Sequence, residues 1–176
     1  MRRLTFFPTE KNSLHYWTHF KNPLVVTRNF IVIEFCKYVP SMAVRRAFLR
    51  LIGIKIGRDT SGALGVQLDI FFPEKIEIGD NTIIGYHSTI LCHEFLVPGL
   101  RTGHVKIGNN VLVGANSTIL AGVAVGDSAT ISAMSLVNKD VKAGDFVGGV
   151  PARRLRDKKL QSAKPSEEKK LKRNSK

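Results

Sequence analysis

The chain has 176 residues, and 27 Lys and Arg against 14 Asp and Glu give it a formal net charge of +13. A hydrophobic fraction of 43% with 23% charged residues excludes a globally disordered chain, and the length suits about one domain. Cys36 and Cys92 are too few for a disulfide framework and lack the spacing of a zinc motif. The net charge suggests a nucleic-acid-binding domain, so the distribution of that charge is the first question.

The positive charge is concentrated at the two ends of the chain. Residues 1–53 carry nine basic and two acidic residues, and residues 153–176 carry eleven basic and three acidic residues. Residues 54–152 have a net charge of −2. We therefore expect an N-terminal helical segment over 1–53, a central domain over 54–152 and a basic, partly disordered tail over 153–176. Neither basic end contains a nucleic-acid-binding motif, so we expect no nucleic-acid partner.

Two helices are predicted before Gly53. Asn22 followed by Pro23 marks the start of the first, because proline suits the first turn of a helix. Its apolar positions are Val26, Phe30, Ile33 and Cys36. Ser41 is the expected cap of the second helix. That helix has apolar residues at i, i+3, i+4 and i+7, opposite three arginines: Val44, Ala47, Phe48 and Leu51 against Arg45, Arg46 and Arg50.

A basic amphipathic helix can lie on an anionic membrane. We favour packing of both helices on the chain's own domain, and we expect no membrane contact. The start of the sequence has no secretory signal, and the most apolar run, residues 24–39, is interrupted by Arg28, Glu34 and Lys37. We therefore expect a cytoplasmic protein.

A six-residue period replaces the helical pattern after Ile54. The repeated positions hold mainly Ile and Val: Ile78, Ile84, Ile90, Leu96, Ile107, Val113, Ile119, Val125, Ile131, Val137 and Ala143. The residues two places earlier are small or β-branched, among them Thr82, Ser88, Val105, Ser117 and Ala129. Alternate residues of a strand share one face, so both positions are expected to point inward. A glycine often follows the repeated position, and we expect it to let the chain bend there.

Three six-residue sides make a triangular coil, and stacked coils pair their short strands in parallel. The expected fold class is mainly β: a parallel β-helix of about five coils, preceded by amphipathic helices and followed by the basic tail. An antiparallel sandwich would not hold one phase for so long. The phase breaks over Asp59–Phe72 and over Leu96–His104, and loops that leave a rigid scaffold often carry functional sites.

Four segments have a more specific pattern: Ile76–Asn81, Val105–Asn110, Val137–Val141 and Gly148–Arg153. The last two, Val-Asn-Lys-Asp-Val and Gly-Gly-Val-Pro-Ala-Arg, resemble the closing segments of the maltose, galactoside and serine acetyltransferase branch of the hexapeptide-repeat acyltransferases. The resemblance covers residues 51–156. It implies a left-handed β-helix, a homotrimer with active sites between subunits, and transfer of an acyl group, usually acetyl, from coenzyme A to a hydroxyl or amine.

The resemblance also implies site residues. His93 matches the family's general base, although it arrives about two residues earlier in a shorter loop. Glu94 could orient the His93 ring, bind the acceptor or be a surface carboxylate; His87, expected to be exposed on the solenoid wall, is the other acceptor candidate. Acetyl-CoA is the expected co-substrate, with no bound cofactor and no metal. Its predicted contacts are Gly85, Ala115, Ala133, Asn138, Lys139, Arg153 and Arg156, with the two arginines facing the ADP phosphates.

We therefore predict an O-acyltransferase, with acetyl as the acyl group. It would act on a hydroxyl of a sugar or other small acceptor by general-base catalysis in a ternary complex. Two alternatives stay open. A γ-type carbonic-anhydrase-like enzyme shares the fold and would bind zinc through histidines such as His87, His93 and His104 across a subunit interface. A non-catalytic scaffold or membrane-surface binder would use the basic ends of the chain.

Overall fold

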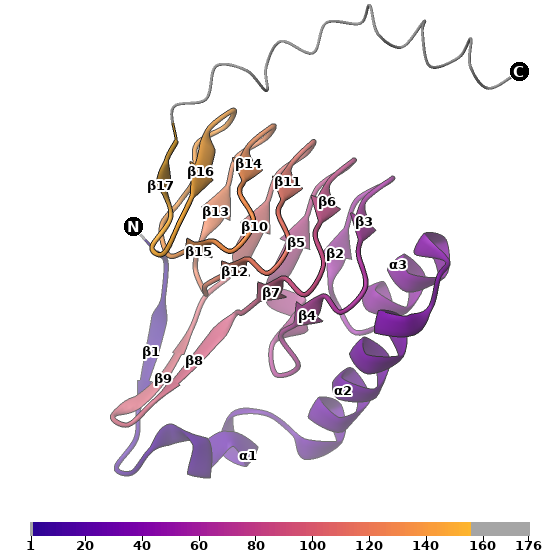
Figure 1. Cartoon of the computed structure of the whole chain (residues 1–176). Helices are drawn as coiled ribbons and strands as arrows, with labels where there is room; N and C mark the ends of the chain where they lie inside the picture. The colour runs from indigo at the N-terminus through magenta and orange to yellow at the C-terminus, as the bar shows by residue number, and fades with distance from the viewer. Residues whose placement is uncertain (1, 156–176) are drawn as a thin grey trace, which may run out of the picture.

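The computed structural model describes residues 2–155, in which short strands wind into a triangular parallel β-helix (Figure 1). The first side contains β2 (Lys55–Ile56), β5 (Ile76–Ile78), β10 (Val105–Ile107) and β13 (Ala124–Val125). The second contains β3 (Ser61–Gly62), β6 (Ile83–Ile84), β11 (Leu112–Val113), β14 (Thr130–Ile131), β16 (Phe146–Gly148) and β17 (Arg153–Arg154). The third contains β4 (Gln67–Leu68), β7 (Thr89–Ile90), β12 (Thr118–Ile119) and β15 (Leu136–Val137). The predicted parallel β-helix is confirmed, and only β17 pairs antiparallel within these sheets.

Three corners join the sides of the solenoid. The first corner follows the first side, the second corner follows the second side, and the third corner returns the chain to the first side of the next coil. Of the basic tail predicted over 153–176, residues 153–155 are described and include β17, whereas Arg156 and the residues after it lie outside the described residues.

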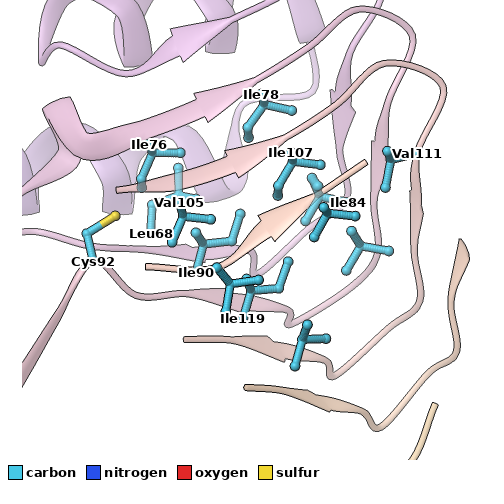
Figure 2. Packing of buried hydrophobic residues seen from close by; sticks show 14 of the residues in the cluster. Leu68, Ile76, Ile78, Ile84, Ile90, Cys92, Val105, Ile107, Val111 and Ile119 are labelled. Atoms are coloured by element: carbon cyan, nitrogen blue, oxygen red, sulfur yellow. The ribbon is translucent and has the colours of Figure 1, made fainter. Parts of the chain in front are cut away.

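The core is a stack of aliphatic side chains inside the solenoid (Figure 2). Ile107 pairs in register with Ile78, so inward residues of successive coils lie on top of one another. Thr82, two places before a repeated position, is fully buried, and its hydroxyl donates to the Gly108 carbonyl at 2.9 Å. The predicted inward positions are confirmed in the regular coils. Leu96 instead lies in a hairpin, and Ala143 lies in an exposed turn.

Most glycines that follow the repeated positions have a different role from the predicted bend. Gly144 is the exception, since it lies in a turn with φ 71° and has open space around it. Gly114 lacks a left-handed backbone, and a Cβ built on it would lie 2.3 Å from the backbone nitrogen of Ala133 in the next coil. At Gly85 the corresponding distance to the Ala115 nitrogen is 2.6 Å. These glycines are required because adjacent coils approach closely. The left-handed residue of the turn comes two positions after the glycine, as at Asn110 with φ 55°.

The two phase breaks have different structures. Residues 59–68 still form a coil, because β3 and β4 pair in register with β6 and β7. The chain leaves the solenoid only after β4, in a loop that contains η2 (Pro73–Lys75). The second break is an antiparallel hairpin of β8 (His93–Leu96) and β9 (Gly99–Thr102) at the third corner. Strand β1 (Thr5–Pro8) pairs with β9, so the start of the chain completes a three-stranded sheet (Figure 1).

The N-terminal helices lead from this sheet to the first coil of the solenoid (Figure 1). They are η1 (Ser13–Tyr16), α1 (Trp17–Phe20), α2 (Pro23–Tyr38) and α3 (Met42–Leu51). Both predicted starts are confirmed: the Asn22 side chain accepts the Leu24 N–H at 2.8 Å, and the Ser41 hydroxyl accepts the Val44 N–H at 3.5 Å. No helix within residues 2–155 is long and apolar enough to cross a membrane.

The inner face of α2 differs from the prediction at one position. Phe30 is 49% exposed, and Asn29 is buried instead, between Val26 and Ile33. The Asn29 amide donates to the Ile70 carbonyl at 2.9 Å, so a polar residue fixes the helix to the loop after β4.

Helix α3 packs with its basic face inward, opposite to the face that an amphipathic helix normally buries. Arg45 is 6% exposed, whereas Val44, Phe48 and Leu51 are 40%, 37% and 75% exposed. The predicted second helix is therefore present and lies on its own domain, but its apolar face points away from the solenoid.

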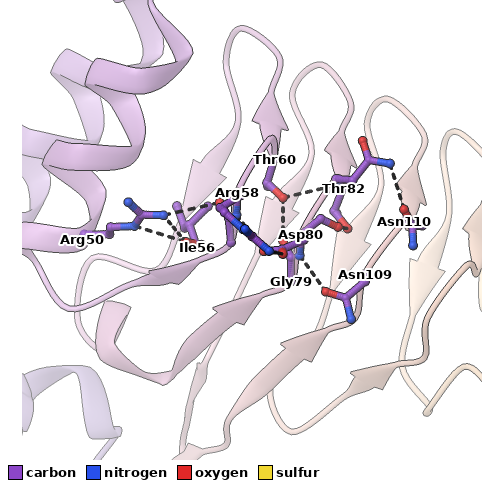
Figure 3. A network of polar contacts seen from close by, with 11 residues as sticks. Arg50, Ile56, Arg58, Thr60, Gly79, Asp80, Thr82, Asn109 and Asn110 are labelled. Atoms are coloured by element: carbon purple, nitrogen blue, oxygen red, sulfur yellow. Dashed lines mark hydrogen bonds and ion pairs between the residues drawn. The ribbon is translucent and has the colours of Figure 1, made fainter.

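The open edge of the first coil explains this orientation. Strand N–H groups donate to carbonyls of the following coil, as Ser61 does to Thr82 at 2.9 Å, so carbonyls of the first coil have no preceding coil to supply donors. Arginines of α3 supply them. Arg46 donates to the Thr60 carbonyl at 3.1 Å, and Figure 3 shows Arg50 beside Ile56, whose carbonyl it reaches at 2.6 Å. Guanidinium groups thus take the place of a coil below the first one.

Candidate active site

The third corner brings His93 next to Asp69. Asp69 directly follows β4 and His93 begins β8, shortly after β7. Strands β4 and β7 are hydrogen-bonded neighbours, with Leu68 opposite Ile90, so the residues after them leave the sheet side by side. Asp69 Oδ2 lies 2.5 Å from His93 Nδ1, across 24 residues of sequence.

Asp69 is held as an ionised carboxylate inside the protein. Its side chain has no exposed surface, and Oδ1 accepts the N–H groups of Phe71 and Phe72 at 2.9 Å each. Oδ2 accepts the Cys92 N–H at 2.6 Å. Burial by itself raises the pKa of Asp69, but the hydrogen bond to His93, the charge of that ring and the backbone N–H groups together outweigh burial and hold the pKa below its ordinary value.

This carboxylate determines where the His93 ring carries its proton. An ionised carboxylate can only accept hydrogen bonds, so Nδ1 is the protonated nitrogen that donates to Asp69. In the neutral ring, Nε2 then keeps its lone pair and can accept a proton. The geometry therefore presents an oriented imidazole base.

The neighbouring thiol does not take part in this chemistry. Burial, followed by the charge of Asp69, raises the pKa of the Cys92 thiol well above its ordinary value. Cys92 is fully buried and stays protonated near neutral pH, whereas a nucleophilic cysteine acts as the thiolate.

Aromatic side chains enclose the His93 ring. Its centroid lies 4.9 Å from that of Phe71 and 4.8 Å from that of Phe95, both near edge-to-face. Trp17 of α1 packs 5.9 Å from Phe71, so the N-terminal segment forms part of this wall. The His93 side chain is 14% exposed. An apolar surround strengthens the hydrogen bond to Asp69 because it lowers the local dielectric constant.

The other candidate residues near the corner lie apart from the ring. Glu94 follows His93 on β8, so its side chain lies on the opposite face of the hairpin, where it forms an ion pair with Arg2. His87 is exposed at the second corner, and His104 is exposed before β10. Residues 2–155 contain no group of three or more His, Cys, Asp or Glu that could hold a metal ion.

Asp69 was not among the residues predicted from the sequence. Its signal was present but ambiguous: an acidic residue directly after the inward Leu68, where the phase breaks. Only the pairing of β4 with β7 shows that this residue reaches His93.

Comparisons with known proteins agree with this architecture. Residues 104–136 match the family model described as the hexapeptide repeat of succinyl-transferase. The Bacillus subtilis (strain 168) protein named "Putative acetyltransferase YvoF" is 51% identical over 134 residues, which cover 74% of this chain and 76% of that protein. The chain belongs to the hexapeptide-repeat acetyltransferase family.

Solved structures share the fold of this acetyltransferase. The hexapeptide-repeat acetyltransferase VCA0836 of Vibrio cholerae O1 biovar eltor, complexed with acetyl coenzyme A, has a TM-score of 0.65 at 23% identity, covering 76% of this chain and 87% of its own. A galactoside acetyltransferase in complex with coenzyme A has a TM-score of 0.59 at 22% identity, covering 77% and 81%.

The predicted coenzyme A contacts of this acetyltransferase lie at two different corners. Gly85, Ala115 and Ala133 lie at the second corner, and the Met134 N–H donates to the Ala115 carbonyl at 2.9 Å, which stacks the two alanines. Ala115 is half-buried and Ala133 is exposed, so a narrow small-residue strip follows the solenoid there.

Asn138 and Lys139 lie at the third corner, the same corner as His93 but in later coils. They line a cleft of about 200 Å³ together with Arg153, which is exposed. The Asn138 Oδ1 atom is buried and finds no hydrogen-bond donor within the described part of the chain. One chain therefore holds its candidate base and its small-residue strip at opposite ends of the third side.

Proposed function

We propose that this acetyltransferase transfers the acetyl group of acetyl-CoA to a hydroxyl of a sugar or other small acceptor, with His93 as general base. The observation that carries the proposal is the buried Asp69 carboxylate 2.5 Å from His93 Nδ1. It leaves Nε2 as the ring nitrogen that can take a proton, which is what a hydroxyl nucleophile requires.

The proposed acetyl transfer consists of a proton transfer to His93, an attack on the thioester and the departure of coenzyme A as a thiol. His93 Nε2 takes the acceptor's hydroxyl proton while the hydroxyl oxygen attacks the thioester carbonyl carbon. The tetrahedral intermediate collapses with cleavage of the carbon–sulfur bond. The coenzyme A sulfur leaves and receives the proton from His93, so the products are an O-acetyl ester and free coenzyme A. The charge of Asp69 stabilises the imidazolium that exists between the two proton transfers.

The separation of the candidate residues supports a site between subunits. In our proposal, the pantetheine arm lies along Gly85, Ala115 and Ala133 of one chain and reaches His93 of its neighbour. Asn138, Lys139 and Arg153 bind the nucleotide end, where a cationic side chain can pair with phosphate. Such a site requires an oligomer, and we propose a homotrimer.

An apolar strip on the outside of the solenoid suits such an interface. Large hydrophobic side chains on the second side and at the second corner are 43–66% exposed: Leu64, Ile83, Tyr86, Leu112 and Met134. Interfaces between copies of one chain are commonly more apolar than other surfaces. Light scattering of the purified protein measures the oligomer directly.

The activity test is release of coenzyme A thiol from acetyl-CoA in the presence of a panel of hydroxyl acceptors. We expect His93→Ala to lower kcat about 10²- to 10⁴-fold, the usual contribution of a general base. His104→Ala, which removes an exposed histidine, is the matched control. An unchanged rate in His93→Ala contradicts the assignment of the base. Absence of thiol release in the wild type, together with zinc in the purified protein, supports the carbonic-anhydrase-like alternative instead.

A further inference from the structure

Helix α2 carries two apolar stripes on opposite sides. Val26, Ile33 and Cys36 are buried, and Ile33 belongs to the hydrophobic core that fills the solenoid. A second stripe, at spacings of seven, four and three residues, consists of Leu24, Ile31, Phe35 and Tyr38, which are 79%, 59%, 49% and 79% exposed. A helix that is apolar on all sides is normally buried on all sides. Within residues 2–155 of a single chain, the second stripe therefore has no packing partner.

Helix α3 extends this stripe. Its basic face caps the first coil, so Val44, Phe48 and Leu51 face outward. The rings of Phe35 and Phe48 lie 5.3 Å apart, near edge-to-face, and join the exposed residues of the two helices into one surface. We define the outer helix face as Leu24, Ile31, Phe35 and Tyr38 of α2 with Val44, Phe48 and Leu51 of α3.

The surroundings of the outer helix face are cationic. Between residues 17 and 58 the chain contains eight Lys and Arg and one acidic residue, Glu34, which pairs with Lys37 at 2.6 Å. Three further cations pair with carboxylates that come later in the sequence: Lys21 with Glu74, Lys55 with Glu77 and Arg58 with Asp80. Among the described residues the remaining four, Arg28, Arg45, Arg46 and Arg50, form no ion pair, so the region keeps a net positive charge. Arg28, one turn from Leu24 on α2, is exposed. Arg50, next to Leu51 on α3, is exposed as well, although its guanidinium donates to the Ile56 carbonyl at 2.6 Å. Positive charge beside an apolar face complements an anionic surface and opposes another copy of the same face.

We propose that the outer helix face binds the surface of an anionic lipid bilayer. The apolar side chains would enter the boundary between headgroups and acyl chains, and the positive charges of Arg28 and Arg50 would attract lipid phosphates. The buried stripe of α2 fixes the helix against the solenoid, so the helix would lie in the plane of the bilayer. This inference goes beyond the acetyl transfer proposed above and does not depend on it.

Flotation with phospholipid vesicles tests the proposal on the full chain. We expect the wild type to float with vesicles that contain phosphatidylglycerol, to bind pure phosphatidylcholine vesicles much less, and to lose binding as salt rises. Leu51→Glu and Ile31→Glu should each lower the binding constant about tenfold or more, because an apolar side chain no longer enters the bilayer. Both residues are exposed, so the fold should be kept, as circular dichroism can verify.

The matched control is Val97→Glu, at the tip of the β8–β9 hairpin. Val97 is 75% exposed, as Leu51 is, but lies outside the outer helix face. The proposal is overturned if the wild type does not bind anionic vesicles, if it binds neutral vesicles equally well, or if Val97→Glu loses as much binding as Leu51→Glu. It is also overturned if Leu51→Glu lowers the oligomer mass in light scattering, because the face would then be an interface between copies.

Discussion

Asp69→Asn isolates the contribution of the buried carboxylate to catalysis. The carboxylate accepts three backbone N–H groups as well as the His93 ring, and an amide of the same size has only one oxygen. In either orientation, its NH₂ group faces a backbone or ring donor. The charge-assisted hydrogen bond to the ring, about 1.5–3 kcal/mol, is lost or weakened. Since 1.36 kcal/mol corresponds to tenfold in rate, we expect kcat to fall roughly 10- to 150-fold.

The thiol-release assay measures this effect, with circular dichroism to show that the variant is folded. The KM for acetyl-CoA should stay near the wild-type value, because Asp69 acts through His93 and does not touch the co-substrate. Nitrogen-15 NMR of the ring should show the Nδ1–H tautomer in the wild type and a changed population in Asp69→Asn. Glu94→Gln is the control, since Glu94 lies next to His93 in sequence but bonds to Arg2. Full kcat in folded Asp69→Asn, or an equal loss in Glu94→Gln, would refute the reasoning.

Three further predictions concern stability. The pKa of Asp69 is lower in the folded than in the unfolded chain, so the ionised carboxylate stabilises the fold above about pH 4. This stabilisation is lost as the pH falls through the folded-state pKa of Asp69. The Tm difference between the wild type and Asp69→Asn should therefore become smaller in acid. Gly114→Ala places a Cβ 2.3 Å from the backbone of the next coil and should lower the free energy of unfolding in urea by about 1–3 kcal/mol. Gly62→Ala is the control, because its Cβ would have no contact nearer than 3.9 Å, and it should leave the free energy of unfolding almost unchanged. Arg45→Met removes the donor of the part-buried carbonyls of Lys37 and Gly62 and should cost about 1–3 kcal/mol. The exposed Arg58→Met should cost only about 0.5 kcal/mol. Equal unfolding midpoints for the two variants would contradict the capping role of Arg45.

The solenoid could be predicted because each coil contacts only the coils beside it. A six-residue period therefore specifies which side chains point inward, and the structure has Ile84, Ile107 and Val113 buried as predicted. The helix starts at Asn22 and Ser41 were equally accessible, since a capping residue acts on backbone groups within a few positions.

For most of the glycines after the repeated positions, the sequence pattern predicted the residue but not the reason why it is required. The position and residue type of the glycines were predicted, but at Gly85 and Gly114 the bend is not their role. The close approach of Gly114 to Ala133 exists only after coils have stacked. A periodic pattern identifies a small residue and does not reveal which neighbour requires it.

The sequence by itself determined the repeat and the helix starts, and its resemblance to the hexapeptide-repeat acyltransferases implied the candidate base His93. Tertiary structure decided the partner of that base, because Asp69 and His93 meet only when β4 and β7 pair. It also decided the orientation of α3. The amphipathic pattern predicts that apolar residues turn inward, but unsatisfied carbonyls at the open edge of the first coil required the arginines there instead. A buried carbonyl without a donor is costly, and the positions of those carbonyls are set by the coils.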